Sequence, residues 1–125
     1  MRGRIRSILP VSVLLLLATA AVLLGETVTV VDVSQLTFQP RAIYNPIPRY
    51  PPEMMAKKIA GKAVIDFICR TDGSTDRIKV VSATNLSFGK AAADAIAIWK
   101  YRPAEYQGHP VNCQLEVPFL FTPSP

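Results

Sequence analysis

Apolar and polar residues alternate along two stretches of the chain, with the period of two that is typical of strands with one buried face. The first stretch covers residues 63–70, and its apolar face carries Ala63, Ile65, Phe67 and Cys69. The second covers residues 112–121, with apolar residues at Cys113, Leu115, Val117, Phe119 and Phe121. A further strand is predicted over Arg77–Ala83, with Ile78 and Val80 inward. The turn Thr71–Ser74, in which Gly73 can take a positive φ, would join it to the first strand as a hairpin.

Two other segments have the patterns of helices. Pro51, Pro52 and Glu53 suit a first helical turn, and the predicted helix ends at Gly61, a left-handed stop signal. A second helix is predicted over Phe88–Tyr101, with Ser87 as candidate N-cap and Pro103 ending it. Its apolar stripe at i, i+4, i+7, i+8 and i+11 consists of Phe88, Ala92, Ala95, Ile96 and Trp99.

The order helix, strand, strand, helix, strand predicts an α+β fold. The second helix carries the chain back, so the third strand should run parallel to the second strand and antiparallel to the first. The third strand therefore fits beside the first, which predicts a three-stranded antiparallel sheet of order 2-1-3 with both helices on one face. Pro118 cannot donate to a ladder, which agrees with an edge position for the third strand.

Residues 1–25 are expected to direct export. Arg2, Arg4 and Arg6 precede an uncharged run of 19 residues from Ser7 to Gly25. As a helix this run would rise about 28 Å, enough to span a hydrocarbon core. Two interpretations stay open: an uncleaved membrane anchor through residues 7–25, or a signal peptide cleaved after Ala18-Thr19-Ala20.

Residues 26–49 are expected to form a short proline-containing linker. Thr27–Phe38 is rich in β-branched residues and is either a short strand, an extended segment lying on the domain, or an ordered linker. Five of the 11 prolines fall between Pro40 and Pro52, which favours an extended, polyproline-like course over Gln39–Arg49. The folded domain is then expected over residues 50–122.

Composition excludes several classes of function. The formal charge of +5 falls to +2 from Glu26 onward, with 11 Lys and Arg against 9 Asp and Glu, so no basic stripe suited to nucleic acid remains. One His and two Cys exclude the usual four-ligand zinc site. His109 lies in a turn without a neighbouring acid or nucleophile, and no nucleophile–base pair is present. We therefore expect neither an enzyme nor a bound cofactor.

A set of short motifs resembles the TonB C-terminal domain family over roughly residues 40–122. These motifs are Tyr50-Pro51, Gly61, Asp72-Gly73, Val81-Ser82, the helix exit Trp99-Lys100-Tyr101-Arg102-Pro103, Gly108, and the ending Val117-Pro118 with Phe121. The resemblance implies a periplasm-facing, protein-binding domain of the bacterial envelope, in a family that joins an inner-membrane motor complex to outer-membrane receptors. In that family the third strand receives a short receptor segment as an added strand.

Two features depart from the energy-coupling members of that family. Residues 1–25 contain no His, and the spacer of residues 26–49 reaches at most about 80 Å when fully extended. The alternative is therefore a stand-alone envelope adaptor that binds a partner strand without coupling energy. The location would be the inner membrane facing the periplasm, or the periplasm if the leader is cleaved.

Two sites are predicted on the third strand. Its edge is expected to bind an outer-membrane receptor or another envelope protein through Val111, Asn112, Cys113, Gln114, Leu115, Glu116 and Val117. Cys69 and Cys113 lie at the same end of neighbouring antiparallel strands and on the same face, which predicts a disulfide. The alternative is two buried free thiols that act as small hydrophobic residues.

Overall fold

The computed structural model describes residues 27–125. Its elements are η1 (Val33–Gln35), β1 (Arg41–Tyr44), α3 (Pro52–Ala56), β2 (Gly61–Cys69), β3 (Thr75–Ala83), α4 (Leu86–Ala97), β4 (Lys100–Arg102), β5 (Ala104–Tyr106), β6 (His109–Val111) and β7 (Cys113–Phe121). The predicted anchor or signal peptide of residues 1–25 lies outside the described residues. None of the helices within 27–125 has the length and apolar composition needed to cross a membrane.

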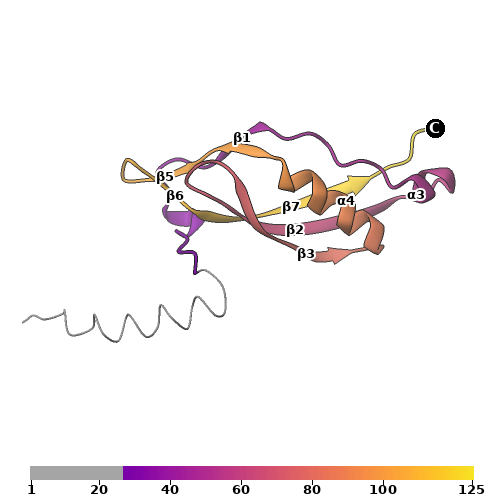
Figure 1. Cartoon of the computed structure of the whole chain (residues 1–125), viewed down its shortest axis with the longest axis horizontal. Coiled ribbons are helices and arrows are strands. Elements are labelled where there is room, and N and C mark those ends of the chain that lie inside the picture. The colour runs from indigo at the N-terminus through magenta and orange to yellow at the C-terminus, as the bar shows by residue number, and fades with distance from the viewer. Residues whose placement is uncertain (1–26) are drawn as a thin grey trace, which may run out of the picture.

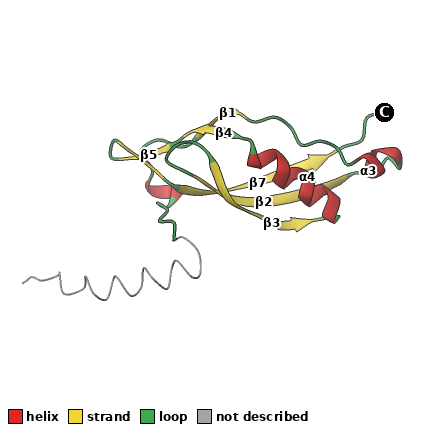
Figure 2. Cartoon of the chain, viewed as in Figure 1, coloured by secondary structure: helices red, strands yellow, loops and turns green. Residues whose placement is uncertain are grey.

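The main sheet has the order β3-β2-β7, and both pairings are antiparallel. This confirms the predicted α+β class and the order 2-1-3. β2 and β7 pair without a shift from Gly61↔Phe121 to Cys69↔Cys113, whereas the β2–β3 register shifts twice. α4 crosses one face of the sheet, and α3 lies at the end where β2 begins (Figures 1 and 2).

The core lies between α4 and the inward face of β2. Ala63, Ile65, Phe67 and Cys69 are each at most 1% exposed and pack in one cluster with Phe88, Ala92 and Ile96 of α4. An added Cβ on Gly61 would lie 2.2 Å from Cε2 of Phe88. Gly61 is therefore needed because the Phe88 ring covers it. Val80 of β3 faces α4 as predicted, since its Cγ1 would lie 3.0 Å from a Cβ built on Gly89, and it is 40% exposed because β3 lies at the edge of the sheet.

Both helices end earlier than predicted. α3 ends at Ala56 because Lys58 takes a left-handed φ of 54°. The N–H of Ile59 then donates to the Met54 carbonyl at 2.8 Å, which closes the helix end. Gly61 is thus not the helix stop, and α3 is one short turn. At α4 the N-cap is Asn85, not Ser87: Oδ1 of Asn85 accepts from the Ser87 N–H at 2.9 Å.

The last two residues of the predicted helix Phe88–Tyr101 belong instead to strand β4, Lys100–Arg102. β4 pairs antiparallel with β1, with Ala42 opposite Tyr101. Nε1 of Trp99 also donates to the Pro46 carbonyl at 2.9 Å. These long-range hydrogen bonds replace the last helical turn. They also hold the segment Arg41–Pro46 against the folded domain. Within the predicted polyproline-like course of Gln39–Arg49, the extended residues Arg41–Tyr44 therefore form a paired strand.

Candidate functional site

The outer edge of β7 is defined by the direction of its backbone groups. Lys62 faces β3, because the N–H of Thr84 donates to its carbonyl and its own N–H donates to Thr84 Oγ1, both at 3.0 Å. Backbone groups of successive strand residues point to opposite sides, so the odd-numbered residues of β2 face β7. Odd residues of β2 pair with odd residues of β7. The N–H and C=O groups of the even-numbered residues of β7 therefore point away from the sheet.

These outward-facing residues are Gln114, Glu116, Pro118 and Leu120. An N–H at position 118 would point outward and would take no part in the β2–β7 ladder, so a proline is tolerated inside this strand. Among the described residues, no backbone hydrogen bond occupies the outward groups of Gln114, Glu116 or Leu120. The stretch Gln114–Leu120 is thus an open template for another strand.

The first two residues of the predicted binding edge lie elsewhere. Val111 pairs with Ala104 in the β5–β6 hairpin. The carbonyl of Asn112 accepts from the Val31 N–H at 2.9 Å, and its Nδ2 donates to the Thr29 carbonyl at 3.1 Å. The open edge therefore begins at Gln114, because the chain itself occupies the hydrogen-bonding groups at Val111 and Asn112.

Side chains on the two faces of the open edge differ in chemistry. On the α4 side, Leu115, Val117 and Phe119 are partly buried against the core. On the opposite face Glu116 lies directly across from Asp66. The hydrogen bond that these two carboxyl groups share, and their mutual repulsion, raise the pKa of Glu116. An added strand would therefore meet apolar side chains on the α4 face, and Gln114 and Glu116 followed by Pro118 and the exposed Leu120 on the other.

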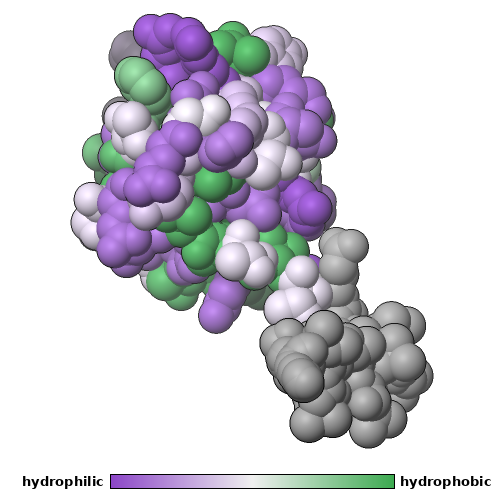
Figure 3. All heavy atoms as spheres, turned by 90° about the vertical axis from the view of Figure 1, so that its left-hand side faces the viewer, coloured by the Kyte–Doolittle hydropathy of each residue, from purple (hydrophilic) through white to green (hydrophobic). Residues whose placement is uncertain are grey.

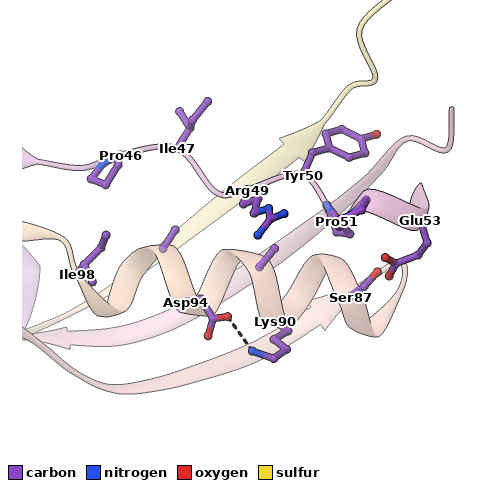
Figure 4. Close-up of a pocket in the computed structure, with 13 residues that line it drawn as sticks. Pro46, Ile47, Arg49, Tyr50, Pro51, Glu53, Ser87, Lys90, Asp94 and Ile98 are labelled. Atoms are coloured by element: carbon purple, nitrogen blue, oxygen red, sulfur yellow. Dashed lines mark hydrogen bonds and ion pairs between the residues drawn. The ribbon is translucent and has the colours of Figure 1, made fainter. Parts of the chain in front are cut away.

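Two hollows flank the extended segment that precedes α3. A groove of about 540 Å³ separates this segment from α4, with Pro46, Arg49 and Pro51 on one wall and Ser87, Lys90, Asp94 and Ile98 on the other (Figure 4). Lys90 and Asp94 form an ion pair at 2.8 Å across one turn of the helix. A second hollow of about 400 Å³ lies beside the far end of the β7 edge, between Ile47, Trp99 and Phe119.

The end of the molecule at the left of Figure 1 carries a mixed surface. Hydrophobic side chains there form small groups between hydrophilic ones (Figure 3). Asp76, which is partly exposed near the start of β3, pairs with Arg70 at 2.7 Å, and this hydrogen bond holds the pKa of the Asp76 carboxyl below its usual value.

Cys69 and Cys113 lie directly opposite each other in the β2–β7 register. Both are free thiols with no exposed surface. The hydrogen bond with Cys113, together with burial, raises the pKa of the Cys69 thiol. The structure thus brings the two cysteines together as the strand pattern predicted, and their disulfide stays a prediction.

The remaining motif residues act within the fold rather than at an open surface. The Tyr50 ring meets Phe88 and Phe121 edge-on, at centroid distances of 5.8 and 5.7 Å, and Pro51, buried, is the N-cap of α3. Trp99 and Tyr101 both pack against Phe67. These contacts make the Tyr-Pro and Trp-x-Tyr motifs part of the core.

The Asp72-Gly73 motif shapes the β2–β3 turn. Oδ1 of Asp72 accepts from the Ser74 N–H at 2.9 Å, and Gly73 has a φ of 85°. The N–H of Tyr101 donates to the Gly73 carbonyl at 2.8 Å, so the turn is tied to β4. Pro103 follows as the residue between β4 and β5.

Within residues 27–125, no group of three or more His, Cys, Asp or Glu side chains is placed to hold a metal ion. His109 is exposed at the start of β6.

Comparison with known proteins gives concordant matches. The model of the family "Gram-negative bacterial TonB protein C-terminal" matches residues 46–123. Protein TonB of Escherichia coli is 28% identical over 74 residues, which are 58% of this chain and 31% of that protein. The chain thus spans about a third of the length of this relative.

Two solved structures share the fold. The solution NMR structure of the Pseudomonas aeruginosa TonB C-terminal domain has a TM-score of 0.61 at 25% identity, covering 69% of this chain and 88% of that one. The TonB2 protein of Vibrio anguillarum has a TM-score of 0.55 at 23% identity, covering 81% and 94%.

Proposed function

We propose, from the premise that this chain belongs to the family of Gram-negative bacterial TonB protein C-terminal domains, that it is a non-enzymatic domain which binds an extended protein segment. The observation that carries this proposal is the open edge Gln114–Leu120. Its outward N–H and C=O groups offer main-chain hydrogen bonds, and the side chains beside them would select the partner.

The partner that this family suggests is an outer-membrane receptor, or another envelope protein with an extended segment. The chain would then act as an energy transducer-like component of transport across the outer membrane, together with an inner-membrane motor complex. This proposal requires no cofactor and no nucleic acid.

A second candidate function is a stand-alone envelope adaptor without energy coupling. It is favoured by the docking of the segment that precedes the domain. Val31 is hydrogen-bonded to Asn112, Phe38 to Glu105, and the Pro46 carbonyl to Trp99. A segment held at these three places does not serve as a long free spacer. Cross-linking in intact cells separates the two functions, since motor subunits should be captured only by an energy-coupling protein.

The edge proposal is tested by removing a single outward N–H. Gln114→Pro removes the N–H of Gln114 without touching the β2–β7 ladder, so the domain should stay folded. Capture of the envelope partner should fall at least about tenfold, because an added strand loses a hydrogen bond and meets the proline ring. The matched control is Gln114→Ala, which keeps the N–H and should retain most of the binding. The proposal fails if partner-induced amide shifts gather on β3 instead of β7.

Location is proposed as the cell envelope, with residues 1–25 as anchor or cleaved leader. Mass spectrometry of membrane and periplasmic fractions distinguishes the two forms. A mature N-terminus at Ala21 would exclude the anchor, and an intact chain in the cytoplasm would exclude export.

A further inference from the structure

The N-terminal segment Thr27–Val31 meets the start of the β7 edge through hydrogen bonds of Val31 and Thr29 with Asn112. The N–H of Val31 donates to the outward carbonyl of Asn112 at 2.9 Å, which is one rung of a strand pairing. The next acceptor in the segment, the carbonyl of Thr29, takes a hydrogen bond from Nδ2 of Asn112 at 3.1 Å. Oδ1 of Asn112 in turn accepts from the Thr71 N–H at 2.9 Å, which fixes the orientation of the side chain.

We take Thr27–Val31 to run antiparallel to β7, as β2 does, and the hydrogen bond between Val31 and Asn112 then sets a register for further pairing. In an antiparallel ladder each step of two residues along one strand is matched by a step of two in the opposite direction on the other. Thr29 is then the partner of Gln114, and Thr27 is the partner of Glu116. The Thr29 carbonyl would accept from the Gln114 N–H, but in the structure it is bonded to the Asn112 side chain instead.

The composition of the segment suits this pairing. Its five residues are all β-branched (Thr27, Val28, Thr29, Val30 and Val31), the type most favoured in strands. The segment therefore has the strand propensity, the register and the first rung needed to cover the free edge. The side-chain amide of Asn112 is the group that diverts it.

We infer that Thr27–Val31 is an intramolecular strand for the β7 edge and that Asn112 is the latch that holds it off Gln114. In the open conformation, the one described here, Thr29 is bonded to Asn112 and the edge is free. In the closed conformation Thr29 pairs with Gln114 and Thr27 with Glu116. If the edge binds a partner as proposed above, the closed conformation competes with it, and the partner's apparent affinity falls with the closed fraction.

The test uses hydrogen exchange of individual amides in the ¹⁵N-labelled intact chain in detergent, with no partner present. Asn112→Asp keeps the Oδ1 acceptor for Thr71 but removes the donor to Thr29. It should slow exchange of the Gln114 and Glu116 amides by about 2- to 10-fold, the range that corresponds to one net hydrogen bond. Adding Thr29→Pro removes an N–H that only the closed conformation uses, and should return exchange at Gln114 to the unmutated rate.

Amides of Ile65 and Phe67 in β2 report whether the variants stay folded. If the Asn112→Asp variant unfolds, the Asn112→Ser variant takes its place in the experiment, because it also lacks the Nδ2 donor. Unchanged exchange at Gln114 in the folded latch variant overturns the inference, and so does slowing that Thr29→Pro does not reverse. Because this readout needs no partner, it stands even if Gln114→Pro shows the edge-binding proposal to be wrong.

Discussion

Oxidation of Cys69 and Cys113 to a disulfide is the prediction that the structure sharpens most. The two residues are a directly opposed pair in β2 and β7, at odd positions whose backbone groups face each other. Such hydrogen-bonded antiparallel pairs have Cα atoms about 5.5 Å apart, inside the range of about 4.4–6.8 Å found for disulfides. The bond can therefore form without a change of register or a shift of either strand.

The expected stabilisation follows from the loop that the bond closes. The loop runs from residue 69 to residue 113, which is 45 residues counted inclusively. The chain-entropy model assigns about 4 kcal/mol to closure of a loop of this length. For a domain of this size each kcal/mol corresponds to about 4–8 °C, so reduction should lower Tm by at most roughly 15–30 °C.

The timing of the reaction also follows from the site. Forming the bond removes two protons and two electrons from the thiols and passes them to a disulfide oxidant of the exporting compartment. The attacking species is a thiolate that an external oxidant must reach, and in the folded core both Cys69 and Cys113 are 0% exposed. The bond should therefore form before β2 and β7 close, and oxidise slowly if the chain folds first.

The assay counts thiols in the chain purified from its own envelope. The protein is unfolded without reductant, alkylated and weighed, and a second sample is reduced first. We expect no alkylated cysteine in the first sample and two in the second. The variant Cys69→Ala with Cys113→Ala is the control, since its Tm should not respond to reductant. Two alkylated thiols per chain without reductant would refute the reasoning, and would favour two buried thiols acting as hydrophobic residues.

Three further predictions test the fold around the site. Gly61→Ala should destabilise the domain by about 1–3 kcal/mol in urea unfolding, since its Cβ would lie 2.2 Å from the Phe88 ring; an unchanged midpoint would contradict the packing described. Trp99→Phe should cost about 1–3 kcal/mol and speed amide exchange at Ile47, because the Pro46 carbonyl loses its donor; unchanged exchange would mean that another contact holds this segment. The pKa of Asp76 is lowered by Arg70, so its contribution to the free energy of unfolding is present above the usual Asp pKa and is lost as pH falls through the folded-state pKa. Asp76→Asn should therefore lower stability at pH 7 and leave it nearly unchanged at pH 2; an equal loss at both would show that charge is not the cause.

Local patterns were sufficient for the three strands of the main sheet, β2, β3 and β7, and for their order. A period of two specifies which side chains of residues 63–69 and 113–121 share a face, and burial then leaves one face for α4. β2 and β3 form a hairpin and α4 then carries the chain back, so β7 runs antiparallel to β2. This chain direction predicted that β2 lies between β3 and β7. The same register carried Cys69 opposite Cys113. These features depend on neighbours along the chain or on chain direction, so they could be inferred without tertiary contacts.

Helix ends and the state of the β7 edge were decided only by the tertiary structure. The apolar stripe of α4 continues through Trp99, but the chain leaves the helix because its backbone and indole find partners in Arg41–Pro46. The left-handed residue that ends α3 is Lys58, and lysine is not a residue type that predicts a helix end. Asn112 has the pattern of an ordinary polar strand residue, yet its hydrogen bonds go to Val31, Thr29 and Thr71. Residues more than 80 positions apart in the sequence bind the same backbone groups, and the local pattern of apolar and polar residues does not indicate which hydrogen bonds form.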